Sequence, residues 1–256
     1  MLGENYIKTN DYLQAQEQYI NGITLYTMEK ESTYFEGNEK IGKLYADLAD
    51  INYLLAGDYD NAAVNYKSAV NLGYDNASIR YRLGYMSYIK KNYQDALGSF
   101  MKAGEGNVKV DNLLFAMGNT LALRNDDYAA EGYFEQLINR LDDEVNQAGG
   151  SMYPQTNTDQ HDLVTLYLYA ANNYGVVLHK IARRTGNSQK NAQSIVQFQQ
   201  SLRAWDSLTR NQTSMKRLEG SNLAAENIKY VTHPVTDFEP SIYLDIPKTL
   251  TDSERL

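Results

Sequence analysis

The sequence has no cysteine, and it has only four prolines, three histidines and one tryptophan among its 256 residues. Without cysteine it can form no disulfide, no thiol nucleophile and no cysteine-ligated zinc site. The histidines, His161, His179 and His233, have no second ligand at metal-binding spacing on one helix face. No serine paired with a histidine and no pair of buried carboxylates stands out. We therefore expect no catalytic residue, no metal site and no cofactor.

Long hydrophobic runs and an excess of basic residues are also missing. The longest apolar runs are only a few residues, so no segment is predicted to cross a bilayer, and no signal-peptide pattern opens the chain. The net charge of −8 argues against general affinity for nucleic acid, which requires clustered lysine and arginine. At 43% hydrophobic and 22% charged residues, the composition is that of a folded protein.

Tyrosine is abundant, with 22 residues, and part of it recurs in an internal repeat. The segments 57–69 and 91–103 align with an offset of 34 residues. The matching pairs are Tyr59 with Tyr93, Ala62 with Ala96, Tyr66 with Phe100, and Ala69 with Ala103. Small residues at two of these positions allow two helices to approach closely, and the aromatic between them fills the space that remains.

This period and pattern resemble the tetratricopeptide-repeat (TPR) family, whose units are pairs of antiparallel helices. The resemblance implies an all-α fold, a TPR helical-hairpin solenoid that winds as a right-handed superhelix. In the family a small residue stands at position 8 of the first helix, where Gly84 and Gly118 lie 34 residues apart. Asp50 occupies this position in the preceding unit and departs from the pattern.

The repeat positions predict a TPR array over residues 1–144. It contains a truncated repeat at 1–38, which suggests a piece of a longer protein, and full repeats at 43–76, 77–110 and 111–144. After a loop, residues 161–230 are predicted to form a divergent TPR-like hairpin and a capping helix, with Tyr174-Gly175 at positions 7 and 8. Residues 231–256 hold three prolines and are expected to form an extended tail packed on the array or on a partner.

The concave surface of a TPR array is lined by the first helix of each repeat. Tyr81, Tyr85 and Tyr88 are spaced i, i+4, i+7 and therefore share one helix face. Rigid aromatics in a groove are typical of binding hot spots, whereas aromatics that simply pack between helices are common in such stacks. Both interpretations stay open. The predicted groove consists of Tyr81, Tyr85, Tyr88, Ile51, Leu54, Phe115 and Asn119.

A basic stretch lies between residues 178 and 220. It contains eight lysines and arginines against two acidic residues, and its predicted patch is Lys180, Arg183, Arg184 and Arg203. This patch could meet an acidic partner, or it could be the solvated face of helices.

The tail also resembles segments of large bacterial TPR proteins of the periplasmic flagellar collar. The residues that carry this resemblance are Asn222-Leu223-Ala224, Asn227, Pro234, Pro240, Ile242-Tyr243 and Ile246-Pro247. It implies a structural subunit of a motor-associated assembly in the bacterial periplasm, and the cytoplasm stays open as an alternative.

The leading hypothesis is a non-enzymatic protein–protein interaction scaffold, part of a larger TPR protein that assembles a multiprotein complex. The alternatives are an adaptor that binds a peptide or small ligand, and a regulatory TPR domain of a larger enzyme. The partners are expected to be other proteins, without nucleic acid and without membrane insertion.

Overall fold

The computed structural model describes residues 2–29, 38–105, 110–147, 158–210, 221–233 and 239–251. Within these ranges all regular structure is helical, which confirms the predicted all-α class. The chain divides into two compact units, which are described separately. Unit 1 comprises Met1–Val108 with Lys248–Leu256, and unit 2 comprises Lys109–Pro247. The predicted array over 1–144 therefore contributes helices to both units, and the predicted repeat boundaries themselves stay predictions.

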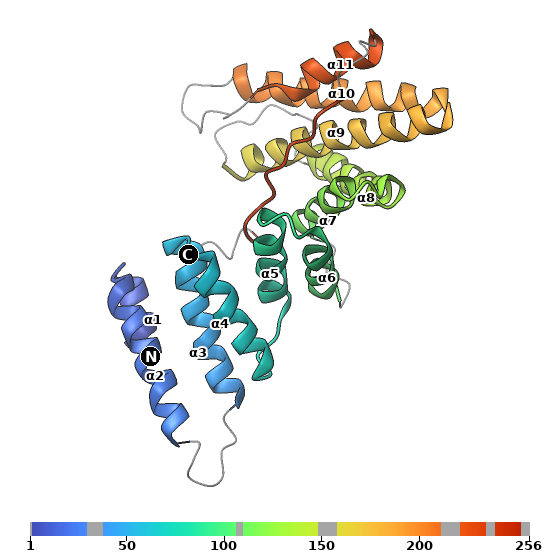
Figure 1. Ribbon diagram of the computed structural model, residues 1–256. Coiled ribbons are helices and arrows are strands. Elements are labelled where there is room, and N and C mark those ends of the chain that lie inside the picture. The colour runs from blue at the N-terminus through green and yellow to red at the C-terminus, as the bar shows by residue number, and fades with distance from the viewer. Residues whose placement is uncertain are drawn as a thin grey trace. The chain divides into compact units, whose positions relative to one another are not determined.

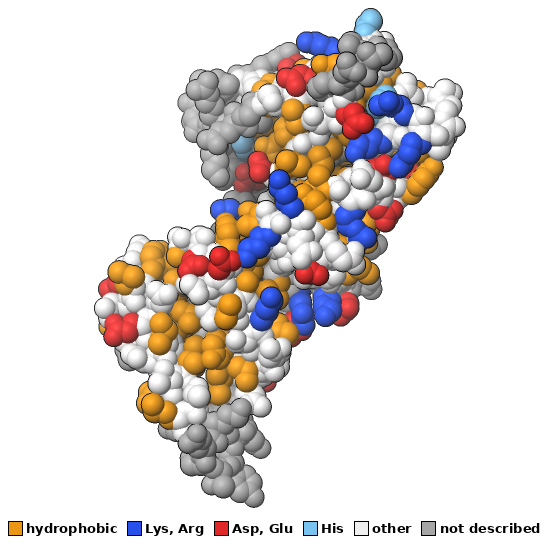
Figure 2. Space-filling model, viewed as in Figure 1, with side chains coloured by type: hydrophobic (Ala, Val, Ile, Leu, Met, Phe, Trp, Pro, Cys, Tyr) orange, Lys and Arg blue, Asp and Glu red, His pale blue; other side chains and the backbone are white. Residues whose placement is uncertain are grey.

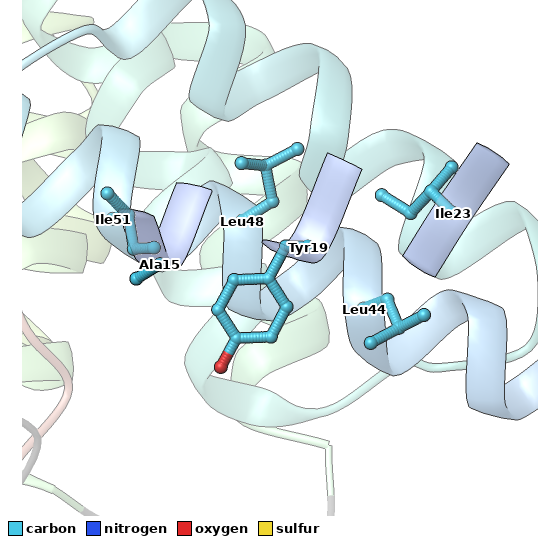
Figure 3. Close-up of a cluster of buried hydrophobic side chains, with 6 residues drawn as sticks. All are labelled: Ala15, Tyr19, Ile23, Leu44, Leu48 and Ile51. Atoms are coloured by element: carbon cyan, nitrogen blue, oxygen red, sulfur yellow. The ribbon is translucent and has the colours of Figure 1, made fainter. Parts of the chain in front are cut away.

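Unit 1 is built from successive helices that pack against their neighbours in the chain (Figure 1). They are α1 (Leu2–Lys8), α2 (Tyr12–Glu29), α3 (Asn38–Asp50), the π-helix η1 (Ile51–Ala56), α4 (Tyr59–Asn71), α5 (Ala77–Ile89) and α6 (Tyr93–Ala103). Tyr19 and Ile23 of α2 meet Leu44 and Leu48 of α3 in a buried apolar cluster (Figure 3). Such a cluster is what allows short helices to be stable in water, because each buries an apolar face that it cannot bury alone.

Unit 2 has longer helices and ends in an extended segment. Its helices are α7 (Asp111–Leu123), α8 (Asp127–Gln147), α9 (Thr158–Thr185), α10 (Ser188–Arg210) and α11 (Leu223–Thr232). After α11 the described residues 239–247 have no regular secondary structure and run across α9 (Figure 1). Helix α11 begins at Leu223, and residues 211–220 lie outside the described part, so the hairpin and capping helix expected over 161–230 stay a prediction.

The turns between paired helices repeat with the sequence period. Gly57, Lys91 and Asn125 stand 34 residues apart, and each has a positive φ near 60°. The following helices begin with side-chain caps: Asp58 accepts from the Asn61 amide, and Asn92 accepts from the Asp95 amide. The reversals at Gly57 and Lys91 are thus each made by one left-handed residue followed by a capping side chain.

The small residue of the first helix lies directly under the aromatic of the second. A methyl group on Gly84 would come within 2.6 Å of the Phe100 ring, and one on Gly118 within 2.8 Å of the Phe134 ring. Likewise, a methyl group on Gly175 would come within 2.7 Å of the Phe198 ring on α10. Only glycine leaves room for the ring at this distance, so the glycine–aromatic pair sets how closely the two helices approach.

Asp50 takes the place of this glycine between α3 and α4, and the contact changes from apolar to polar. The Tyr66 hydroxyl donates a hydrogen bond to Asp50 Oδ1 at 2.6 Å. Arg82 of α5, 5% exposed, forms an ion pair with Asp50 and donates to the Tyr66 hydroxyl at 3.0 Å. The departure from the repeat pattern is therefore compensated by a tyrosine and a buried arginine, which together satisfy the carboxylate.

Candidate functional site

The predicted groove residues of unit 1 are packed between helices. Tyr81 is fully buried with its ring centroid 5.2 Å from that of Phe100, and Tyr88 is 6% exposed against Tyr93 at 5.7 Å. Tyr85 is 8% exposed and lies edge-on to Tyr53 at 5.8 Å. These contacts are those of the packing interpretation, and a role of the three tyrosines in holding a partner stays a prediction.

Ile51 and Leu54 of the same predicted groove belong to the π-helix η1. Ile51 is buried in the cluster with Leu48 and Tyr19, and Leu54 is half-buried. Tyr53, between them, donates its hydroxyl to the Lys248 carbonyl at 2.6 Å. A π-helix shifts side-chain directions relative to an α-helix, and such bulges are frequent at functional positions. In unit 1 the tyrosine of this bulge holds the backbone of the C-terminal segment.

The two groove residues of unit 2 have different surroundings. Phe115 is fully buried, with its ring centroid 6.3 Å from that of Phe134. Asn119 is also fully buried, yet its amide donates to the Tyr243 carbonyl at 3.0 Å. A predicted groove residue therefore contacts an extended polypeptide segment, and that segment belongs to the chain itself.

Four asparagines hold the backbone of this segment, and we call them the asparagine surface: Asn119 of α7, Asn172 and Asn173 of α9, and Asn227 of α11. Their exposed fraction is 0% in each case. A buried amide without hydrogen-bond partners would be strongly unfavourable, so their pairing is what permits their burial.

Two of these amides pair with both backbone groups of one residue. Asn173 accepts from the Tyr243 N–H at 2.7 Å and donates to the Tyr243 carbonyl at 2.8 Å. Asn227 accepts from the Ser241 N–H at 2.9 Å and donates to the Ser241 carbonyl at 2.8 Å. The bound residues alternate along the chain, as they do where an extended strand pairs with one neighbour.

The remaining two asparagines connect these pairs. Asn172 donates to the Ser241 carbonyl at 3.1 Å and accepts from Asn227 at 2.9 Å. Asn119 accepts from Asn173 at 2.7 Å. The four amides thus form one hydrogen-bonded network across three helices, in which each group fixes the orientation of the next.

Side chains of the segment occupy two distinct environments. The Tyr243 ring stacks on Tyr169 with centroids 4.3 Å apart and an interplanar angle of 27°. Its hydroxyl accepts from the Leu223 N–H and donates to the Ser221 carbonyl, both at 3.1 Å. Burial raises the pKa of Tyr243 to about 12, so the hydroxyl keeps its proton at neutral pH.

Ile242 enters an apolar cluster beside the asparagine surface. The buried members of this cluster are Val176, Phe198, Ala224 and Val231. Pro240 is buried, whereas Leu244 is 56% exposed. The asparagine surface and its neighbours therefore bind the backbone of Ser241 and Tyr243 and contact the side chains of Ile242 and Tyr243. The Leu244 side chain is left largely exposed to solvent.

The helix periodicity places these groups. Tyr169, Asn172, Asn173 and Val176 are spaced i, i+3, i+4, i+7 and form one face of α9. Ala224, Asn227 and Val231 form one face of α11 in the same way. This helix begins after Asn222, whose side chain accepts a hydrogen bond from the backbone N–H of Ala225. Each helix presents amides flanked by apolar side chains, which exclude water from the hydrogen bonds.

Several solved structures resemble the chain, including the following two. One is YrrB, described as a TPR protein with an unusual peptide-binding site: the TM-score is 0.53 with 17% identity, over 80% of this chain and 88% of that one. The other is the MamA protein, with a TM-score of 0.50 and 14% identity over 84% and 94%. The chain has a TPR fold. Neither the models of protein families nor the curated proteins contain a match.

Of the four members of the asparagine surface in this TPR fold, only Asn119 was predicted from the sequence as a site residue. Asparagine is a poor residue for the interior of a helix, because its side chain competes with the backbone for hydrogen bonds. Asn172 and Asn173 stand in the middle of α9 between apolar residues, and that was the available signal.

The predicted basic patch is partly paired within the TPR fold. Arg184 forms an ion pair with the buried carboxylate of Asp127, and the nearby Lys190 pairs with Glu131. Arg183 and Arg203 are exposed, and Lys180 is half-buried. Figure 2 shows basic side chains interspersed with acidic ones over the upper part of the view. A patch for an acidic partner stays a prediction.

The described residues also bear on other classes of site. No three His, Cys, Asp or Glu side chains among them are placed to hold a metal ion. None of the helices in the described ranges is long and apolar enough to span a membrane.

Proposed function

We propose that this protein is a non-enzymatic scaffold that holds other proteins by extended segments of their chains, and that the asparagine surface is where it binds them. The observation that carries the proposal is the double pairing of Asn173 with Tyr243 and of Asn227 with Ser241. An amide that satisfies both N–H and C=O of one residue recognises a peptide backbone, which every polypeptide has.

The nature of the occupant favours a protein partner over the other ligand class considered. A small hydrophobic molecule has no alternating donors and acceptors to satisfy four buried amides, and leaving them unpaired would disfavour its binding. An extended peptide satisfies them, as residues 241–243 do here.

The experiment is a peptide-display selection on the full chain. Tyr243→Ala weakens the chain's own segment and leaves the four asparagines in place. Peptides enriched on this variant are then tested on the same variant carrying Asn173→Ala or Asn227→Ala. We expect a loss of retention of roughly tenfold or more, because each replacement removes the acceptor of one peptide N–H and one of the two asparagine donors to the same residue's carbonyl.

Asn71→Ala serves as the matched control, because Asn71 is an exposed asparagine at the end of α4 in unit 1 and does not belong to the asparagine surface. Equal retention on the Asn71, Asn173 and Asn227 variants would contradict the proposal. So would a selection that enriches no peptide.

A more specific form of the proposal concerns the assembly that the scaffold serves. We propose that it is the periplasmic flagellar collar, and the support is the resemblance of the tail. Asn227 and Ile242-Tyr243, which carry that resemblance, are also residues that place the segment on the asparagine surface. Electron tomograms of a strain lacking the protein should show motors without collar density, and unchanged motors would rule this form out.

A further inference from the structure

Backbone pairing alone does not require a tyrosine at position 243, yet the surroundings of Tyr243 contact both its ring and its hydroxyl. The ring has a stacking partner in Tyr169, and the hydroxyl has both a donor in the Leu223 N–H and an acceptor in the Ser221 carbonyl. A phenylalanine ring would stack as well but would leave both backbone groups without this partner. A shorter side chain would leave the face of Tyr169 uncovered.

The neighbouring positions add to this selectivity. Ile242 packs against the buried apolar cluster of Val176, Phe198, Ala224 and Val231, so an apolar side chain is required immediately before the tyrosine. Leu244, which follows the tyrosine, is 56% exposed, so the side chain at that position is unrestricted. Pro240, which is buried, favours the extended backbone that the asparagines pair with.

From these contacts we infer that the asparagine surface carries a tyrosine-selective subsite, formed by Tyr169, Ser221 and Leu223, and that its ligands are extended segments with an apolar residue followed by tyrosine. Residues 239–247 are the resident occupant of this subsite, and a partner segment of the same pattern competes with them. The inference rests on the proposed function, because it names which segments the asparagine surface prefers.

The test uses the full chain with Tyr243→Ala as receptor and fluorescent nine-residue peptides as probes. The parent peptide has the sequence of residues 239–247, and its variants replace the tyrosine by Phe or Ala, or Leu244 by Ala. We expect binding to weaken roughly fivefold for Phe, from loss of the hydroxyl's hydrogen bonds. For Ala we expect roughly thirtyfold or more, from loss of the stacked ring. The Leu244→Ala peptide, the matched control, should bind within about twofold of the parent.

Two receptor variants separate the subsite from the backbone pairing. Tyr169→Ala should reduce the preference for Tyr and Phe over Ala while Asn173→Ala weakens all peptides alike. Equal affinities for the Tyr, Phe and Ala peptides, with loss of all three on Asn173→Ala, would overturn the subsite and leave the scaffold proposal standing. If Asn173→Ala does not change peptide binding, or if no peptide binds at all, both the subsite and the scaffold proposal would be overturned.

A second measurement needs no replacement in the receptor. Hydrogen exchange of the Ser241 and Tyr243 amides in the wild-type chain reports how often the resident segment leaves, because both amides donate to asparagines. An excess of the parent peptide should accelerate their exchange, and the Ala peptide should not. Equal effects of the two peptides would contradict the inference.

Discussion

Replacing Gly84 by alanine tests the contact that sets the spacing of the paired helices. The new methyl carbon would lie 2.6 Å from Cδ1 and Cε1 of Phe100 and 3.1 Å from Cγ. Carbon atoms in good contact are separated by roughly 3.5–4 Å, so the ring would have to move by about 1 Å. Phe100 is fully buried and its ring packs against Tyr81, so a shift of this size would disturb its neighbours.

The magnitude follows from two opposing effects. Overpacking of a filled core destabilises by about 1–3 kcal/mol, and at this distance we expect the upper half of that range. The higher helix propensity of alanine stabilises the folded state by about 1 kcal/mol relative to glycine. The net effect of Gly84→Ala is therefore a destabilisation of about 1–2 kcal/mol.

Gly98 offers a matched control on α6 of the same hairpin. It is exposed, and a methyl group added to it would have no atom within 4 Å. Gly98→Ala should therefore stabilise the protein by about 0.5–1 kcal/mol through helix propensity alone. The two variants carry the same chemical change in helices of the same hairpin, and they should shift stability in opposite directions.

The assay is urea unfolding followed by circular dichroism, with hydrogen exchange in α5 and α6 to report local opening, because repeat arrays need not unfold in one step. The difference between the two midpoints should be about 1 M. A Phe100→Leu background should reduce the penalty of Gly84→Ala, because the smaller side chain makes room. A rise in stability with Gly84→Ala equal to that with Gly98→Ala would refute the reasoning.

Three further predictions concern single residues. Asp50→Ala should lower the free energy of unfolding by about 2–4 kcal/mol, because it removes the carboxylate that pairs with the buried Arg82. Asp60→Ala breaks an exposed pair with a lysine and should cost no more than about 0.5 kcal/mol; urea unfolding distinguishes the two variants. Lys91→Gly should raise the free energy of unfolding by up to about 1 kcal/mol, since φ is 60° there; no gain in urea unfolding would mean that the lysine is unstrained. Burial lowers the pKa of His179 below its usual value of 6.5, so the folded state takes up this proton less readily than the unfolded one. Stability should therefore fall as the pH drops below about 6.5, and the slope should flatten in His179→Gln; identical slopes would contradict the assignment.

The all-helical repeat class could be predicted because its signal is local and periodic. The 34-residue offset that aligns Tyr59 with Tyr93 reappears in the structure as left-handed turn residues at Gly57, Lys91 and Asn125. The glycines at position 8 could be predicted for the same reason, since a small residue lies beneath an aromatic at the same place in the α5–α6 and α7–α8 hairpins. Even the departure at Asp50 was visible, although its partner Arg82, 32 residues away, was not.

The candidate site could be predicted only in part. Asn119 was found because it follows Gly118 at a known position of the repeat, but its neighbours on the asparagine surface come from α9 and α11. The chain separations between these asparagines and Ser241 or Tyr243 range from 14 to 124 residues. No periodicity relates such positions, because they lie on three different helices and on an extended segment.

The sequence alone thus determined that helices form, where they pair and how closely they approach, because these properties depend on residues at fixed short spacing. The tertiary structure decided which polar groups face each other. Buried asparagines are stable only where something pairs with their amides, and here that partner is an extended segment from the far end of the chain. A polar surface of this kind exists only once the helices and the segment that it binds are brought together.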